Sequence, residues 1–555
     1  MIRLLRTISL LGAVFLGIAG QAQVLRVYQK HYVVPVVKEN THTIVTRLCV
    51  NRAEAYPHAY LKTIRIDLTG TTDLSDIVGI KIWGTTDSNF LSQKNLSSAS
   101  IFGQYILETG NNNIINISGQ YRLSKKYEYL WLGVQLKHTA EVGNEIHLAV
   151  QSVNIDGQWF KINEGKVPAR RVATAVRSAG QDNVHTSRIP GIAKAPNGDL
   201  LAIYDARYAS ARDLQGDIDI GLSRSTDKGN SWSPVQPIMD MGMWGGLPEK
   251  FNGVSDPCIL VDKNSNTVFV AGLWMHGVLD NNGLWIEGLT DTSTVWNHQW
   301  RNRGSQPGLD VKQTSQFLLV KSTDNGKTWS QPINLTAMCK KEEWWLWAPA
   351  PGNGIVLKDG TLVFPTQGRD ATGKAFSNIT YSKDGGKTWK TSKPASASST
   401  TECAVVELSD GALMLNMRTN ANKGVTGPDN GRTVAVTRDL GETWQVHPTS
   451  RNALPEPVCM ASLYRHDYKS LDGKNRSVLL FVNPNSKTHR NNITLKLSFD
   501  DGLTWPTDKY VLLDELNGRG YSCITSVDDE TIGILYESSQ ADLVFEKISL
   551  TELIK

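Results

Sequence analysis

Short runs in which apolar and polar residues alternate fill the chain from about residue 180 onward. In runs such as QFLLVKS, TVAVTRD and ITLKLSFD, alternate side chains fall on opposite faces, which predicts β-strands. Turn-and-strand units such as KDGTLVFPT and SDGALMLNMR lie between them, and their Asp-Gly turns are typical of β-hairpins. This part of the chain is therefore predicted to be a series of antiparallel hairpins.

A related octapeptide follows five of the predicted strands, as STDKGNSW, STDNGKTW, SKDGGKTW, TRDLGETW and SFDDGLTW. The aspartates at its third position are residues 227, 324, 384, 439 and 500, so the successive gaps are 97, 60, 55 and 61 residues. A repeat of about 40–60 residues made of short strands is typical of β-propeller blades. The first gap is longer, and we expect its polar, Trp-rich stretch within residues 271–310 to be an insertion loop.

Each octapeptide is expected to be a structural turn and not part of a catalytic site. The aspartate carboxylate can accept hydrogen bonds from backbone N–H groups two or three residues on, and the glycine supplies a positive φ angle. The Ser or Thr hydroxyl and the terminal Trp, buried between blades, would lock the hairpin. One active site has no use for five copies of a catalytic group. The chemistry is therefore expected on other strand ends and loops around the propeller axis.

Residues 23–165 contain no octapeptide and are predicted to form a separate antiparallel β-sandwich, because segments such as TIRIDL, IVGIKIW and EYLWLGVQL alternate in the same way. Residues 166–182 are polar and mildly basic and are predicted to be a linker, which places the propeller in residues 183–555. Three aromatic residues of the sandwich could stack on a sugar ring, but core positions are favoured for them: Trp83, Tyr121 and Trp131.

The first 22 residues, MIRLLRTISLLGAVFLGIAGQA, combine Arg3 and Arg6 with an apolar run and then small residues. This pattern predicts a secretory signal peptide that is cleaved near Ala22–Gln23. The apolar run is short for a membrane anchor, and no stop-transfer flank follows it. The protein is therefore expected to be exported, to the periplasm or the medium, without a membrane span.

The formal charge of +4, or +2 once Arg3 and Arg6 are removed, is close to neutral for 555 residues. No run of Lys or Arg appears either, so nucleic acid is not an expected partner. The six cysteines lie far apart and form no CxxC pair, which argues against a zinc site. Several lie in apolar strand-like runs, where cysteine acts as a small buried hydrophobic residue. Disulfide pairing and oligomeric state stay open.

The segments SRIPGI, TECAVVEL, LNMRTN and RGYSC, together with the octapeptides (Asp boxes), resemble those of bacterial exo-α-sialidases, or neuraminidases, in the same order. The resemblance covers about residues 180–550 and extends to the secreted sialidases of gut Bacteroides-type bacteria. It implies an all-β protein with a six-bladed β-propeller catalytic domain, preceded by a carbohydrate-binding-like β-sandwich. Five boxes for six blades are expected because a blade can lose its box. The resemblance also implies a retaining exo-α-sialidase that acts on sialylated glycans and uses no metal or cofactor.

The resemblance places Arg188, Arg418 and Arg490 in a clamp on the substrate carboxylate, and makes Glu537 the acid that orients Arg188. A planar guanidinium can meet a carboxylate with two parallel hydrogen bonds. Three converging arginines would repel one another without an anion, so such a site selects an acidic ligand.

Tyr521 matches the family's nucleophile, and Glu402 matches its partner base. The anomeric carbon of a sialic acid already bears a carboxylate, so an attacking anion would meet a repulsion that a neutral phenol avoids. With a pKa near 10, only about one phenol in a thousand is ionised at pH 7, so the tyrosine needs a base. Sialidases with a tyrosine nucleophile are a known exception to the two-carboxylate rule of glycosidases.

The acid/base residue is sought among four aspartates in YDARYASARDLQGDIDIGLS, which are Asp205, Asp213, Asp217 and Asp219. Asp213 lies 25 residues after Arg188 in a small polar loop, and it fits the family's catalytic aspartate best. Asp217 and Asp219 fall on the start of a predicted strand, and Asp205 could cap the strand LLAIY. As the acid/base, Asp213 would protonate the leaving oxygen and then activate water.

Asp256, in VSDPCIL, matches a family acid near the N-acyl group and the C4 hydroxyl of the sugar, although a turn residue before Pro257 would look the same. Trp274 and Met275 are candidates for the pocket that holds the N-acetyl methyl group.

Two alternatives stay open at this point. The same centre could transfer the sialyl group to another sugar or form an intramolecular anhydro product, and product analysis separates these from hydrolysis. A glycan-binding propeller without activity could also carry Asp boxes. Such a protein would be expected to lack the Tyr521–Glu402 pair or the arginine clamp.

Overall fold

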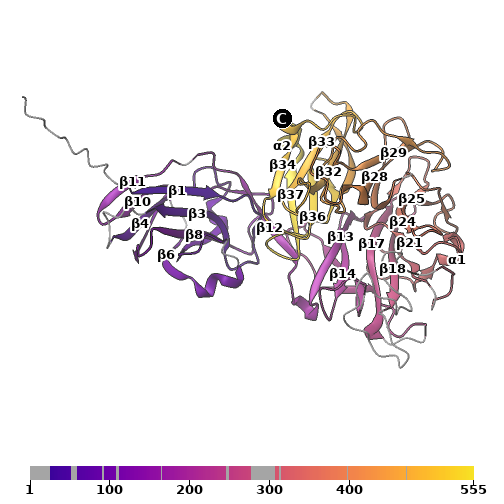
Figure 1. Cartoon of the computed structure of the whole chain (residues 1–555), viewed down its shortest axis with the longest axis horizontal. Helices are drawn as coiled ribbons and strands as arrows, with labels where there is room; N and C mark the ends of the chain where they lie inside the picture. Colours follow the sequence, from indigo (N-terminus) through magenta and orange to yellow (C-terminus); the bar gives the residue numbers. More distant parts are fainter. Residues whose placement is uncertain are drawn as a thin grey trace, which may run out of the picture.

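The computed structural model of the protein describes residues 25–51, 59–89, 93–107, 112–163, 165–214, 216–245, 249–276, 305, 307–311, 314–396, 398–470 and 472–554. The predicted signal peptide and residues 277–304 of the expected insertion loop lie outside these residues. The regular secondary structure of the described chain is mostly β, with short 3-10 turns and two short α-helices, α1 (Thr336–Cys339) and α2 (Leu550–Ile554). It forms a smaller N-terminal part, in indigo and violet in Figure 1, beside a larger ring of sheets. None of its helices is long and apolar enough to cross a membrane.

The N-terminal part is a β-sandwich, as predicted. One sheet consists of β1 (Arg26–His31), β3 (Thr43–Asn51), β8 (Tyr127–Leu136), β5 (Ile77–Thr85) and β6 (Ser100–Ile106), and the other of β11 (Gln158–Lys161), β10 (Ala149–Ile155), β4 (Tyr60–Asp67) and β7 (Ile114–Arg122). Buried residues recur along β4 and β7 and put the apolar face of the sheet in the core. Trp83 and Trp131 are buried in that core, and Tyr121 packs against it while its hydroxyl donates to Glu128 at 2.9 Å. The expectation of core roles for these three residues is confirmed.

The larger part is a β-propeller of six antiparallel blades in the described chain. From the inner to the outer strand, blades 1 to 3 consist of β13 (Thr186–Lys194), β14 (Leu200–Arg207), β15 (Ile218–Ser225) and β16 (Gln236–Met239); β17 (Asn252–Asp262), β18 (Thr267–His276), β19 (Gln316–Ser322) and β20 (Ile333–Asn334); and β21 (Leu346–Pro349), β24 (Leu362–Arg369), β25 (Ala375–Ser382) and β26 (Lys390–Thr391). Blades 4 to 6 consist of β27 (Thr400–Glu407), β28 (Leu413–Thr419), β29 (Thr433–Thr437) and β30 (Gln445–Val446); β31 (Ser462–Lys469), β32 (Asn475–Pro484), β33 (Ile493–Ser498) and β34 (Val511–Asp514); and β35 (Ser522–Asp528), β36 (Thr531–Tyr536), β37 (Leu543–Ser549) and β12 (Arg170–Arg177). The inner strands β13 and β35 contact each other, so the last blade meets the first and the ring closes.

The outer strand of blade 6 corrects the prediction that residues 166–182 are a linker. β12 lies in this stretch and pairs antiparallel with β37, with Thr174 opposite Phe545. It also pairs with β2 (Val36–Val37) and β9 (Glu145–Ile146). The buried Arg170 side chain donates to the carbonyl of Tyr32 at 2.7 Å. The connection between the sandwich and the propeller is therefore a strand that is hydrogen-bonded to both.

The same strand explains why blade 6 has no Asp box. In the other five blades the box connects the third strand to the fourth, as between β25 and β26. In blade 6 the third strand is β37, and the fourth, β12, comes from a point in the chain before blade 1. No hairpin joins the two strands, so there is no turn for a box to close. The expectation that a blade had simply lost its box is replaced by this topological reason.

The Asp boxes are closed by their own side chains, which confirms that they are structural turns. In the third box, Ser382 Oγ donates to Asp384 Oδ1 at 2.8 Å and accepts from the Gly386 N–H at 2.9 Å. The Thr388 N–H and hydroxyl donate to the two carboxylate oxygens of Asp384 at 2.9 and 2.6 Å. The other four boxes repeat this pattern.

The glycine of each box packs closely on the preceding blade. Gly386 has a φ of +84°, and a Cβ there would lie 2.8 Å from the ring of Phe269 in blade 2. In the first box, a Cβ on Gly229 would lie 2.1 Å from Phe545 in blade 6. The box tryptophans differ from the prediction, because Trp389 is buried and the other four are half-buried.

All six cysteines are free, five of them buried and Cys49 half-buried. They act as small apolar residues of the strands, as their sequence context predicts. The question of disulfide pairing is thereby answered for the described chain.

Candidate functional site

Polar side chains gather at the end of the ring where the inner strands begin. Arg188 on β13 is paired with Asp205 at the end of β14, so both strands bring charged side chains to this end. Three inner strands are irregular there, with register shifts at Arg188/Gly191, Ser255/Cys258 and Thr400/Cys403. Such an irregularity turns a side chain out of the regular alternation. Ile189 and Asp256 have positive φ angles of 59° and 55°, a costly conformation that proteins keep mainly at functional sites.

Arg188 and Glu537 form the first cluster of the site. The Arg188 Nε and Nη2 donate to the two Glu537 oxygens at 2.9 and 3.2 Å. The backbone N–H groups of Ile189 and Tyr521 donate to the same carboxylate at 3.1 and 3.0 Å. Burial opposes the ionisation of Glu537, but the Arg188 charge and these hydrogen bonds hold its pKa below the ordinary value. Blades 1 and 6 are therefore joined at the site by a buried, fully paired carboxylate.

Tyr521, Glu402 and Arg418 form the second cluster, between blades 6 and 4. The Tyr521 hydroxyl donates to Glu402 Oε1, and Arg418 Nη1 donates to Glu402 Oε2 at 2.6 Å and to the Tyr521 oxygen at 3.0 Å. Tyr521 and Glu402 are 6% and 7% exposed, so the pair is nearly removed from water. Burial, with a further contribution from the Glu402 charge, raises the pKa of Tyr521 well above its ordinary value. The phenol is neutral in this arrangement and has a carboxylate ready to take its proton.

Arg490 completes a set of three arginines around Tyr521. It lies in the connection between β32 and β33, and its Nη1 donates to the Arg519 carbonyl at 3.0 Å. The Arg188 and Arg490 guanidinium carbons lie 5.4 and 5.5 Å from the centre of the Tyr521 ring. Arg418 Nε is buried and has no acceptor among the described residues. The three arginines that the resemblance singles out therefore converge on one tyrosine.

Asp213 lies beside a buried charge pair in the loop between β14 and β15. Arg207 Nη2 donates to Asp213 Oδ1 at 2.6 Å and to the fully buried Asp205 at 2.7 Å. The Asp213 side chain is 54% exposed, and its charge acts on Arg188 and on Asp256. Of the four candidate aspartates, Asp213 alone combines an open carboxylate with contact to this cluster. Burial raises the pKa of Asp205 to about 6, and Arg207 opposes that rise.

The two remaining candidates interact with a different set of residues. Asp219 is on β15 and accepts from the Tyr208 hydroxyl at 2.9 Å. Burial, together with the negative charges of Asp240, Asp217 and Glu249, raises the pKa of Asp219 to about 8. Asp217 directly precedes β15, and burial raises its pKa to about 6. Both stand where the sequence pattern puts them, at the start of a strand.

Asp256 is half-buried, and its backbone N–H donates to Asp205 Oδ1 at 3.1 Å. Burial and the charges of Asp213, Glu402 and Asp205 raise the pKa of Asp256 well above its ordinary value. This carboxyl group therefore feels the charges of both Asp213 and Glu402.

The candidates for the N-acetyl pocket do not face an open space. Trp274 is buried against Trp244, with ring centres 4.6 Å apart, and Met275 is buried among Leu214 and other apolar residues. Trp274 packs among residues of blades 1 and 2, and Met275 packs between Leu214 and β21 of blade 3, so a role in an N-acetyl pocket stays a prediction.

Two charged residues near the site, Arg207 and Arg519, are not predicted from the sequence, and Asp205 is predicted there only as one of four acid/base candidates. Asp205 and Arg207 are two residues apart at the end of β14, so strand alternation puts both side chains on one face. That spacing, visible in the segment DAR, was a usable signal. Arg519 precedes the tyrosine by two residues in GRGYSC, and the motif that identifies Tyr521 contains it.

The described residues contain no cluster of three or more His, Cys, Asp or Glu side chains arranged to hold a metal ion. The groups that this site offers are guanidinium donors, carboxylates and one phenol. They can bind an acidic ligand, exchange protons and supply an oxygen nucleophile.

Comparison with known families gives two matches that divide the chain as the fold does. Residues 25–159 match the N-terminal domain of BNR-repeat neuraminidase, and residues 189–510 match the BNR repeat-like domain. The first covers the sandwich strands and the second covers most of the propeller.

Individual relatives agree with these matches. A sialidase of Bacteroides fragilis is 42% identical over 451 residues, which is 80% of this chain and 78% of that protein. A sialidase of Micromonospora viridifaciens is 32% identical over 369 residues, which is 64% of this chain and 50% of that protein. Among solved structures, the Hadza microbial sialidase Hz136 matches with a TM-score of 0.84 and 33% identity, over 95% of this chain and all of that one.

Proposed function

The chain belongs to the BNR-repeat neuraminidase (sialidase) family of glycoside hydrolases, and from this premise we propose that it is a retaining exo-α-sialidase. It releases terminal, α-ketosidically linked sialic acids from glycoproteins, glycolipids and oligosaccharides through a covalent sialyl-tyrosine intermediate. One observation carries the proposal. The buried Tyr521 hydroxyl donates to Glu402 while Arg418 holds both groups, next to two more arginines.

Substrate binding is assigned to Arg188, Arg418 and Arg490, which grip the carboxylate of the sialic acid. Glu537 holds the Arg188 guanidinium in one orientation, so the side chain loses less conformational entropy when the ligand binds. The buried Arg418 Nε without an acceptor is a donor that a ligand oxygen can satisfy. Asp256 is assigned to the sugar's polar substituents, because its carboxyl is within electrostatic reach of Asp213 and Glu402.

In the first step the Tyr521 oxygen attacks the anomeric carbon, and its proton passes to Glu402. Asp213, in its protonated form, gives its proton to the glycosidic oxygen, and the bond from the anomeric carbon to that oxygen breaks. Because burial raises the pKa of Tyr521, the phenol is not ionised beforehand and the transfer to Glu402 accompanies the attack. The products are the free aglycone and a sialyl group bound to Tyr521.

In the second step Asp213 takes a proton from water, and the water oxygen attacks the anomeric carbon from the side that the aglycone has left. The bond to the Tyr521 oxygen breaks, and Glu402 returns the proton to the phenolate. Two displacements at one carbon retain its configuration. Arg207 holds the Asp213 carboxylate in place for both proton transfers.

We further propose that the chain works outside the cytoplasm. Residues 1–22 serve as the signal peptide, residues 23–165 as the sandwich domain, and residues 183–555 together with β12 as the catalytic domain. The near-neutral charge and the three-arginine site favour sialylated glycans over nucleic acids as partners.

The proposal is tested with the purified protein from Gln23 onward and a fluorogenic α-N-acetylneuraminide, with the product followed by proton NMR. The account expects hydrolysis in which the α anomer of sialic acid appears first. Release of the β anomer first would contradict retention, and an anhydro sugar or a sialylated acceptor would show a different outcome at the same centre. A protein that binds sialic acid without turnover would be a glycan-binding propeller.

A further inference from the structure

Arg519 stands at the edge of the site just described, two residues before Tyr521. Its carbonyl accepts the hydrogen bond from Arg490 Nη1, so its backbone is part of the arrangement that holds the clamp. Gly520, with a φ of 92°, lies between it and Tyr521 and sets the turn. The residue is half-buried.

The Arg519 guanidinium has no hydrogen bond or ion pair with any described residue, and its Nη1 is buried without an acceptor. Other arginines with a buried unpaired nitrogen are anchored elsewhere: Arg418 to Glu402, Arg177 to Asp182 and Arg224 to Asp199. Arg519 has no such anchor. A half-buried cation without a partner costs free energy in the folded protein.

The charges around Arg519 increase that cost. Arg188 and Arg207 are close enough to lower the pKa of Arg519, as burial does, while Asp542 and Glu537 oppose the shift. Both of these acids are already engaged, since Asp542 accepts from the Ser187 N–H at 2.9 Å and Glu537 is paired with Arg188. The guanidinium is therefore within electrostatic reach of two paired arginines, and its own donors are unused.

We propose that Arg519 is a further substrate-binding residue, whose guanidinium donates to a carboxylate or hydroxyl oxygen of the sialyl group beside Arg188. This inference rests on the proposed function, because it needs an oxygen-rich acidic ligand at Tyr521. The position argues for the sialyl group and against the aglycone. Arg519 is two residues from the proposed nucleophile, its carbonyl accepts from Arg490, and its guanidinium is within electrostatic reach of Arg188.

The variant Arg519→Gln tests the assignment through binding and stability together. The inhibition constant of free N-acetylneuraminic acid is expected to rise about tenfold or more, since a charged hydrogen bond is lost. KM is expected to rise by the same factor for a methylumbelliferyl sialoside and for sialyllactose, with kcat changed less than about twofold. Arg519→Lys, which keeps the charge but loses the planar fork, should fall between the variant and the parent.

The melting temperature of the ligand-free protein separates binding from a structural role. Arg519→Gln removes an unpaired charge that lies beside two arginines, so it should melt at the same temperature as the parent or higher. The control Arg476→Gln makes the same chemical change at an exposed ion pair with Asp472, and should alter neither binding nor melting by a measurable amount.

The possible outcomes are distinct. An unchanged inhibition constant for free sialic acid overturns the assignment, and so does a rise in KM for sialyllactose alone, which would place the contact in the aglycone. A lower melting temperature with reduced kcat and unchanged binding would make Arg519 structural. If the parent binds sialic acid but does not hydrolyse sialosides, the proposed function fails while the binding comparison still decides the role of Arg519.

Discussion

The two ends of the propeller axis are built from the same six blades and differ in how their charged side chains are paired. At the end where the inner strands begin, buried polar groups pair across blades, as Arg188 with Glu537 and Tyr521 with Glu402, and guanidinium N–H groups are left over. At the opposite end a cavity of about 590 Å³ is lined by residues of the inner strands and their turns. That volume lies within the usual range of ligand sites.

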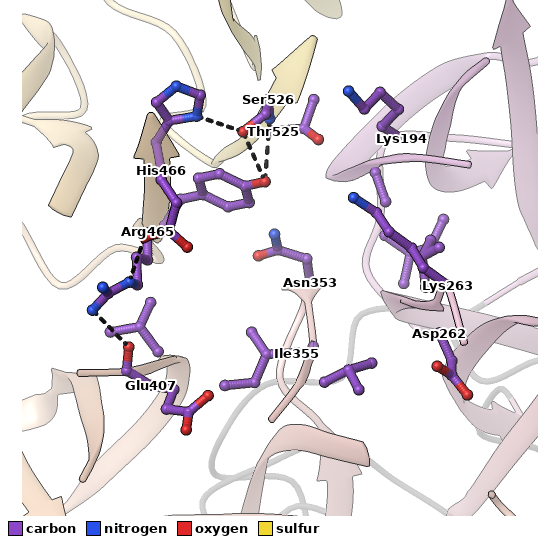
Figure 2. A pocket seen from close by; sticks show the side chains of 18 of the residues that line it. Lys194, Asp262, Lys263, Asn353, Ile355, Glu407, Arg465, His466, Thr525 and Ser526 are labelled. Atoms are coloured by element: carbon purple, nitrogen blue, oxygen red, sulfur yellow. Dashed lines mark hydrogen bonds and ion pairs between the residues drawn. The ribbon is translucent and has the colours of Figure 1, made fainter. Parts of the chain in front are cut away.

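Several polar side chains that line this opposite cavity are hydrogen-bonded within the protein, as His466 is to Ser526 in Figure 2. Arg465 donates to Asp467 at 2.9 Å, and His466 lies 2.7 Å from Ser526 Oγ and 3.1 Å from the Asp529 carbonyl. Lys194 donates to the Val527 carbonyl at 3.0 Å. The comparison teaches that a hollow does not by itself identify a site. Charged side chains that converge away from water and keep unused hydrogen-bond donors identify a functional site better.

The largest expected effect comes from matched tyrosines at the two ends. Tyr521→Phe removes the proposed nucleophile, and we expect kcat/KM to fall by about a thousandfold or more in a fluorogenic sialidase assay. Tyr464→Phe removes a hydroxyl that lies 3.1 Å from Ser526 Oγ in the opposite cavity, and should change kcat/KM less than about twofold. Equal losses in both variants would break the distinction between the ends.

Matched arginines give the next largest effect. Arg188→Lys keeps the charge but cannot reproduce the two-pronged contact with a carboxylate, so kcat/KM should fall about a hundredfold. Steady-state kinetics with a sialoside measure this change. Arg465→Lys at the opposite end should stay within about twofold of the parent. An Arg188→Lys enzyme of normal efficiency would remove Arg188 from substrate binding.

The Asp boxes lie at the opposite end too, because β14 returns to the site and β15 leads away from it to Ser225. Gly386→Ala puts a Cβ at a positive φ against Phe269 and should destabilise the protein by about 1–3 kcal/mol. Gly385→Ala is the control, with a positive φ but no atom within 4 Å, and should cost about 1 kcal/mol. Chemical denaturation measures both. The account is contradicted if Gly386→Ala lowers kcat/KM while the protein remains fully folded.

The smallest expected effect is the acid sensitivity of a box. Hydrogen bonds from the Thr443 hydroxyl and N–H, and from Thr437, lower the pKa of Asp439 to about 2. A lowered folded-state pKa stabilises the protein above the ordinary aspartate range, and that stabilisation is lost as pH falls from about 4 to 2. Asp439→Asn should therefore melt below the parent at pH 7, and the difference should shrink at pH 3.

The control for this experiment is Glu442→Gln, an exposed carboxylate in the same box that pairs with Lys393 at 3.2 Å. An exposed pair of this kind contributes little, so melting should be unchanged at both pH values. A difference between Asp439→Asn and the parent that is independent of pH would show that the carboxylate charge is not what stabilises the turn.

Much of the site could be predicted because its residues occur in short motifs. RIP, TEC and GYS point to Arg188, Glu402 and Tyr521, although the last two are 119 residues apart and meet only in the fold. The Asp boxes predict the blades because each box closes its own turn with local hydrogen bonds. Local hydrogen bonding of this kind can be predicted from the sequence without knowledge of the long-range contacts.

The parts that could not be predicted depend on long-range burial. The sequence predicts a linker at β12 because Arg170 and Arg177 look solvated, yet both are buried and hydrogen-bonded in the fold. Trp274 and Met275 are equally plausible in a pocket or a core until the strand packing is known. Arg519 had no signal of its own in the sequence, because the absence of a partner for its guanidinium is visible only once the surrounding side chains are placed.

The central claim is that Tyr521 is the nucleophile, and trapping the intermediate tests it most directly. The protein is incubated with a fluorinated sialosyl fluoride, which slows the second displacement, and the labelled peptide is identified by mass spectrometry. The account predicts one sialyl group per chain, attached to Tyr521 and absent from Tyr521→Phe. A label on Glu402 or Asp213, or turnover by Tyr521→Phe at the rate of the parent, would contradict it.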